Sequence, residues 1–332
     1  MITTGSMNNF QNIPWQEIKR FGQRTMLDNP LFSVSWILGR FCNYNCSYCW
    51  PYARSDTPDH QQLEVYKSTI DEIKRQARAN GFDRFHWSFS GGEPTAYKQL
   101  LELIQHLDDG PITPYQSVHM TTNLSPGLNW WKRWAANTSM LQRRSITASH
   151  HAEFANEIEF AHKILQLMSD GVFVTVNQVM VPEQFYELYE KCQRLNNRGI
   201  NVTLKPQSDP TASRIVDGYS DRMIELMQTG FPQYSGSEEL YQIALYDGDN
   251  NEYLFDQAER FNAFGFNRFR DWSCNSGFQS VIIRGMEVKR SYSCHDVPLG
   301  TLDNFKLFTA PQPCITPSCV SSADSKIPKC II

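Results

Sequence analysis

The chain has 332 residues, of which 41% are hydrophobic and 13% aromatic, and this length exceeds that of one average domain. No window approaches the run of about 18 apolar residues that a membrane span requires, so we expect no membrane partner. The formal net charge of -4 provides no basic field for nucleic acid, which we also do not expect as a partner.

Nine cysteines are many for an intracellular enzyme, but disulfides are not expected. The N-terminus lacks a charged start followed by an apolar segment, which argues against secretion. We therefore predict a cytoplasmic protein whose cysteines are reduced and bind metal. Residues 5–7, Gly-Ser-Met, resemble a cloning remnant placed before a native start at Met7.

Residues 1–31 are predicted to be a short lead-in with one helix over residues 15–26, which ends before Asn29-Pro30. Residues 32–40 are typical of a strand, because apolar side chains alternate with small polar ones. This strand leads directly into a loop that is rich in cysteine.

The loop reads Cys-Asn-Tyr-Asn-Cys-Ser-Tyr-Cys from Cys42 to Cys49, with three and then two residues between its cysteines. Cys46 and Cys49 alone would suit zinc or redox chemistry as well as iron–sulfur chemistry. Cys42 at the three-residue spacing, and Tyr48 just before the last cysteine, favour one iron–sulfur cluster, whose ligands are thiolates. Three ligands leave the fourth iron of such a cluster open.

Helices and strands then alternate along the chain. A helix is predicted over Leu63–Ala79, because Val65, Ile70 and Ile73 fall on one side of it. Further strands are predicted at residues 84–89, 117–122, 145–149, 172–180 and 200–206. Further helices are predicted at residues 98–107, 128–136, 152–169 and 182–196. Six strands alternating with helices imply parallel βαβ units, two short of a closed eight-fold barrel.

A second motif, Ser-Phe-Ser-Gly-Gly-Glu-Pro-Thr at residues 88–95, lies where the second of these strands ends. A lone Gly-Gly-Glu would be a weak signal, but this one follows the cysteine loop by one βα unit. Together the two motifs resemble the radical S-adenosylmethionine (SAM) enzymes. The resemblance implies a partial (β/α)6 barrel over residues 32–207, with both motifs at the C-terminal ends of its strands.

The resemblance also implies how the cofactors are held. SAM would chelate the open iron through its amino and carboxylate groups, and Tyr48 would stand near the adenine. The backbone of Gly91 and Gly92 and the carboxylate of Glu93, in a motif completed by Pro94, would hold the SAM amino group. Further SAM contacts are expected from polar residues near the ends of later strands: Asn123, Thr147, Ser149 and Asn177. Each of these is equally consistent with an ordinary polar group at a strand end.

Two residues are catalytic candidates. His150 directly follows Ser149, and Lys205 lies near the end of the sixth strand. Both are predicted to face the cavity, where either would bind substrate or move a proton. A register shift of one residue would turn them outward.

Residues 208–270, with a helix over residues 213–227, are predicted to bridge to the C-terminal part and to cover the barrel mouth. Five cysteines follow in residues 271–332. Between Cys274 and Cys294 the pattern predicts a β-hairpin turning at Arg284-Gly285, and residues 298–302 are predicted to start a helix. This part resembles the twitch and SPASM modules of radical SAM enzymes, which hold auxiliary 4Fe–4S clusters.

Five cysteines suffice for one auxiliary cluster and not for two. The expected ligands are Cys274, Cys294, Cys314 and Cys319. Cys330 is the alternative to Cys319 as the fourth ligand, because the last two ligating cysteines of the family are usually closer in sequence than Cys314 and Cys319 are. A zinc knuckle built from the same thiolates is the alternative. Cys192, in a predicted helix, is expected to be a buried thiol.

The resemblance implies an enzyme that reductively cleaves SAM to a 5′-deoxyadenosyl radical, which abstracts hydrogen from a substrate. An electron donor such as flavodoxin or ferredoxin would be needed. The auxiliary cluster would accept an electron from the substrate or bind the substrate directly.

We expect a small-molecule substrate, because the 41 residues before Cys42 leave no room for a fused leader-peptide recognition domain. Such a domain can be a separate protein, so a radical SAM maturase of a ribosomally made peptide is the alternative. A third hypothesis is a catalytically inactive protein that binds a metal cluster and acts in regulation. The intact Cys42, Cys46, Cys49 and Glu93 argue against it.

Overall fold

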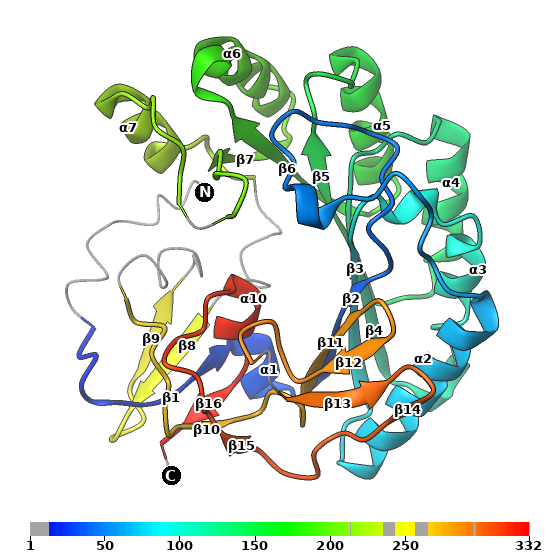
Figure 1. The fold of residues 1–332 in the computed structure, drawn as a ribbon, viewed down its shortest axis with the longest axis vertical. Coiled ribbons are helices and arrows are strands. Elements are labelled where there is room, and N and C mark those ends of the chain that lie inside the picture. The colour runs from blue at the N-terminus through cyan, green and yellow to red at the C-terminus, as the bar shows by residue number, and fades with distance from the viewer. Residues whose placement is uncertain (1–12, 213, 235–242, 256–264, 295–296, 332) are drawn as a thin grey trace.

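The computed structural model describes residues 13–331 apart from 213, 235–242, 256–264 and 295–296 (Figure 1). The expected cloning remnant at residues 5–7 lies outside the described residues. Two β-sheets, of ten and six strands, organise the described part of the chain. None of its helices is both long and apolar enough to cross a membrane.

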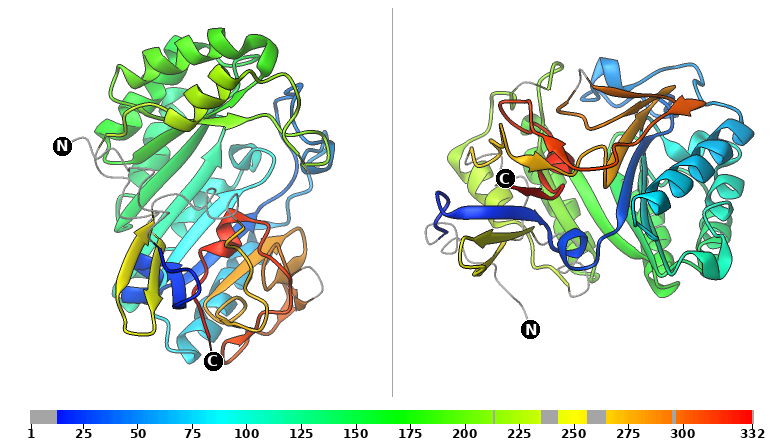
Figure 2. Two further views of the ribbon diagram at one scale, coloured as in Figure 1. Left: turned by 90° about the vertical axis from the view of Figure 1, so that its left-hand side faces the viewer. Right: turned by 90° about the horizontal axis from the view of Figure 1, so that it is seen from below.

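The larger sheet contains six parallel strands in chain order. They are β2 (Phe32–Ile37), β3 (Arg84–Ser90), β4 (Tyr115–Thr122), β5 (Arg143–His150), β6 (Phe173–Met180) and β7 (Asn201–Pro206). Figures 1 and 2 show that this sheet is curved, with helices along its outer side. The predicted partial (β/α)6 barrel is confirmed.

Five helices cover the outer side of the sheet. They are α2 (Leu63–Ala79), α3 (Leu100–Gln105), α4 (Leu128–Asn137), α5 (Glu157–Ser169) and α6 (Phe185–Asn196). Short 3-10 turns lie in the connections: η2 (Pro51–Ala53), η3 (Pro94–Ala96), η4 (Gly110–Ile112) and η5 (Pro182–Gln184). The α2 helix has the predicted bounds. The α5 helix begins later than predicted, because Asn156 caps it by accepting hydrogen bonds from the Ile158 and Glu159 amides.

The sheet separates an apolar layer from a polar one. On β2, Trp36 and its outward-facing neighbours are buried in the core beneath the helices, whereas Ser33 and Ser35 are half-buried on the inner face. Successive side chains of a strand point to opposite faces, so this alternation fixes the register of β2. The concave inner face of the barrel is therefore polar.

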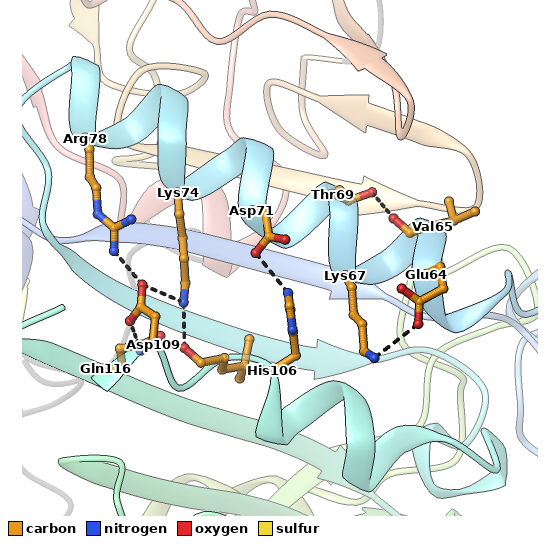
Figure 3. Close-up of polar contacts among 11 residues, drawn as sticks. Glu64, Val65, Lys67, Thr69, Asp71, Lys74, Arg78, His106, Asp109 and Gln116 are labelled. Carbon is orange, nitrogen blue, oxygen red and sulfur yellow. Dashed lines mark hydrogen bonds and ion pairs between the residues drawn. The ribbon is translucent and has the colours of Figure 1, made fainter. Parts of the chain in front are cut away.

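Charged side chains tie α2 to the loop before β4 (Figure 3). The buried Lys74 ammonium donates a 2.6 Å hydrogen bond to the carbonyl of Leu107 and lies 3.3 Å from the carboxylate of Asp109. The Arg78 guanidinium donates to the same carboxylate at 2.6 Å. Each cation at this junction thus has a negative partner.

The larger sheet continues beyond β2. Strand β11 (Ser280–Arg284) pairs with β2 in parallel, and β12 (Glu287–Lys289) pairs with β11 antiparallel, which confirms the predicted hairpin. Gly285 turns it with a φ of 60°, which favours glycine. The helical start predicted at residues 298–302 is wrong, because β13 (Pro298–Thr301) pairs with β12 and with β14 (Asn304–Phe305).

The smaller sheet is antiparallel and joins both ends of the described chain, in the order β15-β10-β16-β1-β8-β9. Its strands are β1 (Ile18–Gln23), β8 (Ile243–Asp247), β9 (Glu252–Phe255), β10 (Ser273–Cys274), β15 (Gln312–Pro313) and β16 (Lys329–Cys330). The helix predicted over residues 15–26 is wrong. That segment is β1 followed by the short α1 (Arg24–Asp28), because pairing with β8 and β16 overrides its local preference.

Two further helices complete the described elements. The α7 helix (Asp221–Thr229) begins after Ser220, whose hydroxyl accepts a hydrogen bond from the Met223 amide. The predicted helix over residues 213–227 begins too early: residue 213 lies outside the described residues, but residues 214–220 are described and are not helical. The α10 helix (Ser322–Ser325) precedes β16.

Candidate functional site

The two sequence motifs meet at the C-terminal ends of β2 and β3. The amide of Gly92 donates a 2.9 Å hydrogen bond to the carbonyl of Gly39, and the amide of Glu93 donates one of 2.8 Å to the carbonyl of Phe41. A Cβ on Gly91 or Gly92 would collide with carbonyl oxygens of this same segment. Glycine is therefore required for the second motif to lie against the chain that leads into the cysteine loop.

The three cysteines of the loop differ in burial, with Cys46 buried, Cys42 half-buried and Cys49 exposed. Burial raises the pKa of all three thiols, and that of Cys46 to about 12, with Glu153 and the other two cysteines adding to the effect. Because a cluster binds thiolates, metal binding here must release protons.

Several nitrogen atoms lie close to the sulfurs. The Tyr44 amide donates to Cys42 Sγ at 3.4 Å, and Asn123 Nδ2 lies 4.0 Å from the same sulfur. His151 Nδ1 lies 3.2 Å from Cys46 Sγ. The amide groups of Tyr44 and Asn123 near Cys42 Sγ suit a thiolate ligand of an iron–sulfur cluster, so the residues present fit that group.

The loop between β5 and α5 holds the cysteine loop in place. The carboxylate of Glu153 accepts hydrogen bonds from the Ser47 amide at 3.0 Å and from the Ser47 hydroxyl at 2.6 Å. His151 Nδ1 lies 2.8 Å from the Tyr48 hydroxyl, and the rings of Tyr44 and Phe154 stack. We call His151, Glu153 and Phe154 the clamp.

The charge states of the clamp follow from burial. Burial lowers the pKa of His151 to about 4, so its imidazole is neutral at pH 7. Burial also raises the pKa of Tyr48 above its usual range, so the phenol stays protonated. Glu153 and Phe154 were not predicted as site residues, although both lie directly after a barrel strand, where residues of such sites are found.

Glu93 is 2% exposed, and its carboxylate is saturated by its own chain. It accepts hydrogen bonds from the amide and hydroxyl of Thr95, from the hydroxyl of Thr122 at 2.7 Å and from the amide of Asn123 at 2.6 Å. Pro94 is buried beside it. Glu93 therefore joins the end of β3 to the end of β4, and its predicted contact with SAM stays a prediction.

The other predicted cofactor contacts lie on the inner face of the sheet. Thr147 and Ser149 of β5 and Asn177 of β6 are half-buried, and Ser149 stands opposite Asn177 in the register. Lys205 is half-buried on β7, opposite Val179. These four residues share one polar surface, as predicted from strand alternation.

His150 faces away from this surface, so its predicted orientation is wrong. Its ring packs against Phe160 of α5, its Nδ1 lies 2.6 Å from the side-chain oxygen of Gln178, and it is 2% exposed. On β5 it shares the outer face with Ile146 and Ala148, an even number of residues away. The one-residue offset from Ser149 turns it toward the helices.

Two histidines that the prediction left without a role lie on the inner face instead. His86 Nδ1 is 2.8 Å from the hydroxyl of Ser117, and His119 Nδ1 is 2.9 Å from that of Ser145. Thr147 Oγ1 lies 3.2 Å from His119 Nε2. Burial lowers the pKa of His86 to about 4 and that of His119 to about 3, so both are neutral at pH 7.

Four C-terminal cysteines gather near the smaller sheet and are buried: Cys274, Cys294, Cys314 and Cys319. A hydrogen bond from Cys319 lowers the pKa of Cys314 to about 5, while burial, with small contributions from Cys274 and Cys314, raises that of Cys294. In the described part of the chain no three His, Cys, Asp or Glu side chains converge on a single ion position. In a four-iron cluster each thiolate binds a different iron, so the four sulfur atoms lie farther apart than the ligands of a single ion do.

Cys330 lies apart from this group. In β16 it stands opposite Ser273, whereas its neighbour Lys329 stands opposite Cys274. Adjacent residues of a strand point to opposite faces, so Cys330 and Cys274 lie on different faces of the sheet. Cys192 is fully buried in α6.

Comparison with known proteins matches residues 36–142 to the family model described as the Radical SAM superfamily. No curated protein matches the chain. Native anSMEcpe with bound AdoMet has a similar fold, with a TM-score of 0.51, 13% identity, and coverage of 82% of this chain and 78% of that chain.

Two further structures of anSMEcpe are similar. The hexahistidine-tagged form with bound AdoMet has a TM-score of 0.52 and 15% identity, and covers 83% of this chain and 79% of that chain. Native anSMEcpe with AdoMet and the Kp18Cys peptide has a TM-score of 0.51 and 14% identity, and covers 82% of this chain and 78% of that chain. At these identities the likeness shows a shared fold.

Proposed function

We propose that this chain, whose residues 36–142 match the Radical SAM superfamily, is a radical SAM enzyme that abstracts hydrogen from a small polar substrate with the help of one auxiliary cluster. The observation that carries the proposal is the meeting of the cysteine loop and the Gly-Gly-Glu motif at the same end of a parallel sheet. When bound at Cys42, Cys46 and Cys49, the cluster supplies the electron that cleaves SAM to methionine and a 5′-deoxyadenosyl radical. A reductant such as flavodoxin or ferredoxin would deliver that electron.

The chain itself positions these groups. The clamp holds Ser47 and Cys46, and Glu93 fixes the end of β3 to the end of β4. Gly91 and Gly92 bring the backbone of the second motif against the cysteine loop. The proposed SAM contacts are those of the second motif, Gly91, Gly92, Glu93 and Pro94, together with Tyr48, Asn123, Thr147, Ser149 and Asn177.

A polar substrate is supported by the inner face of the sheet, where neutral His86 and His119, several hydroxyl groups and Lys205 point away from the apolar core. Lys205 is the candidate for substrate binding or proton transfer on this face. His150 is no longer a candidate, because it lies beneath α5.

We also propose Cys274, Cys294, Cys314 and Cys319 as the ligands of the auxiliary cluster. All four thiols are buried, and Cys294, Cys314 and Cys319 interact electrostatically with other members of the set. The place of Cys330 on the other face of the sheet supports Cys319 as the fourth ligand.

A second candidate substrate is a peptide. It is favoured by one observation, namely that a structure of anSMEcpe with a similar fold contains the bound Kp18Cys peptide. In that case one side chain of the peptide would reach the polar inner face of the barrel, and the rest of the peptide would lie outside it.

The test is anaerobic reconstitution with iron and sulfide, followed by incubation with dithionite and SAM. We expect 5′-deoxyadenosine from the parent chain and none from a variant with Cys42, Cys46 and Cys49 replaced by Ala. No 5′-deoxyadenosine from a fully loaded parent would contradict the proposal. Stimulation of its formation by the low-molecular-mass fraction of a cell extract would support the first substrate class, and stimulation by the peptide fraction alone would support the second.

A further inference from the structure

Two buried cations lie among the four C-terminal cysteines. Lys329 and Arg290 are each 2% exposed. Lys329 stands opposite Cys274 across the pair of β16 and β10, and its charge acts on Cys314 and Cys319. The charge of Arg290 acts in the same way on Cys294.

The ammonium of Lys329 is held by neutral groups. It donates hydrogen bonds of 2.8 Å to the carbonyl oxygens of Asp324 and Ile327. It also lies over the rings of Phe269, 4.8 Å from the centroid, and Phe21, at 5.7 Å. The carboxylate of Asp324 is engaged elsewhere, with the amides of Tyr292 and Ser293 and the hydroxyl of Ser293.

The guanidinium of Arg290 is also held by neutral groups. It donates to the carbonyls of Ser276 at 3.1 Å, Gln312 at 3.1 Å and Pro313 at 3.2 Å. These carbonyls belong to the segments that carry Cys274 and Cys314. Arg290 therefore joins two of the cysteine-bearing segments, yet like Lys329 it forms no ion pair with any carboxylate of the described residues.

A buried charge without an opposite charge nearby is costly, because carbonyl dipoles and aromatic faces replace only part of its lost hydration. The same chain shows the usual arrangement at Lys74, a buried lysine that also donates to a carbonyl but has the carboxylate of Asp109 beside it. The Lys329 charge acts on Cys314 and Cys319, whose thiols carry negative charge when they bind metal.

We propose that Lys329 and Arg290 are the counter-charges of an iron–sulfur cluster bound by Cys274, Cys294, Cys314 and Cys319, and that they set its reduction potential. A cluster with four thiolate ligands is a net anion, and it becomes more negative when it is reduced. Fixed positive charge next to it favours the reduced form and raises its potential. Both are positioning residues, and the inference rests on the ligand set of the proposed function.

The test uses the chain with Cys42, Cys46 and Cys49 replaced by Ala, so that only the auxiliary cluster remains. Lys329→Met removes the charge, Lys329→Arg keeps it, and Lys74→Met removes a buried lysine from another part of the molecule. Iron and sulfide content and the midpoint potential, from a titration followed by electron paramagnetic resonance, are measured for each. With the cluster in place, we expect Lys329→Met to lower the equilibrium constant for one-electron reduction of the cluster at least tenfold. The midpoint potential then falls by at least about 59 mV.

Lys329→Arg and Lys74→Met are expected to keep the parental potential. An unchanged potential in Lys329→Met with a full cluster overturns the inference and leaves the proposed function standing. If the chain with Cys42, Cys46 and Cys49 replaced by Ala, and no other change, binds no iron, both the auxiliary cluster and the inference are overturned. If Lys329→Met does not hold a cluster, Lys329→Gln decides: it retains hydrogen-bond donors without the charge, so a lowered potential supports the inference and a parental one overturns it.

Discussion

At the residue scale, the face on which a strand places a side chain decides the role open to that residue. Lys329 and Cys330 are neighbours in sequence, but only Lys329 shares a face of the smaller sheet with Cys274. His150 and Ser149 are separated in the same way on β5. A functional role argued for one residue therefore does not extend to the next one along the strand.

The first prediction concerns the fourth auxiliary ligand. In the chain with Cys42, Cys46 and Cys49 replaced by Ala, Cys319→Ser is expected to lose most of its iron, because a cluster with three thiolate ligands is easily lost. Cys330→Ser is expected to keep about four irons per chain, the content of one 4Fe–4S cluster. Iron and sulfide analysis after anaerobic reconstitution checks this, and the opposite result would make Cys330 the ligand.

The second prediction concerns the inner-face histidines. The pKa of His86 falls from an ordinary 6.5 to about 4 on burial, so between these pH values the unfolded chain binds more protons than the folded one. Stability therefore rises with pH across this window and is lost as the pH falls, by at most about 3 kcal/mol for this residue.

Urea unfolding at several pH values between 4 and 7 measures this dependence. His86→Asn is expected to reduce the slope without removing it, because burial also lowers the pKa of His119 and of His151. The matched replacement of the exposed His162, His162→Asn, is expected to leave the slope unchanged. If the unfolding free energy changes equally with pH in the parent and in His86→Asn, His86 does not contribute to this pH dependence.

The two motifs were recognised directly in the sequence. The family resemblance, and not a strand register, singled out Thr147, Ser149 and Asn177, which lie on the inner face of the sheet. His150 was predicted to face inward together with Ser149, but the alternation that turns Ser149 inward turns its neighbour outward, onto the face of Ile146 and Ala148. The hydrogen bonds of Glu153 depend on a contact with Ser47, from which it is distant in sequence, and no local pattern encodes that contact.

At the element scale, the loop between β5 and α5 is the main support of the cysteine loop. Its clamp reaches Cys46, Ser47, Tyr48 and Tyr44. The length of this loop is set by Asn156, which delays the start of α5. A helix starting at residue 152, as predicted, would draw these side chains into its first turn and away from the cysteines.

The third prediction follows from this support. Glu153→Ala removes hydrogen bonds at an exposed position, each contributing about 0.5–1.5 kcal/mol. The cysteine loop should then open more often, and iron should leave the cluster of Cys42, Cys46 and Cys49 several-fold faster when a chelator is added. Glu187→Ala, on the exposed face of α6, is the matched control and is expected to lose iron at the parental rate. Equal rates for all three chains would contradict a supporting role for Glu153.

The N-terminal segment shows where element prediction failed. β1 lies between β8 and β16, which come from distant parts of the chain, and Phe21 on β1 is fully buried with Ile243 and Leu245. Local sequence carries no information about such partners. By contrast, α2 was predicted with its full length, because its apolar side chains repeat with the helical period.

At the scale of the whole molecule, the C-terminal segment completes both sheets. β11 covers the edge of the barrel at β2, and β10, β15 and β16 join β1 in the smaller sheet. The barrel strands therefore do not form an isolated unit in this structure. An open edge at β2 would expose a row of unpaired backbone groups to other chains.

The fourth prediction tests this dependence. A chain that ends at residue 270 lacks β11, and we expect it to aggregate, because the edge of β2 is then uncovered. Size-exclusion chromatography and light scattering measure this. The full chain with Gly285→Asn, which retains β11 and a residue tolerant of positive φ, is expected to stay unaggregated. A monodisperse truncated chain would show that the barrel is stable without its C-terminal strands.

The sharing of one sheet by β1 and β16 has a consequence for the order of biosynthesis. The contacts that hold the segment with Cys42, Cys46 and Cys49 come from β2 to β5 and the clamp, all of which are synthesised before the C-terminal cysteines. Cys274, Cys314 and Cys319 pack in one apolar cluster with Phe21, and Lys329 lies over the Phe21 ring. The auxiliary centre therefore depends on β1 and β16 together, and it cannot be completed until translation has passed Lys329.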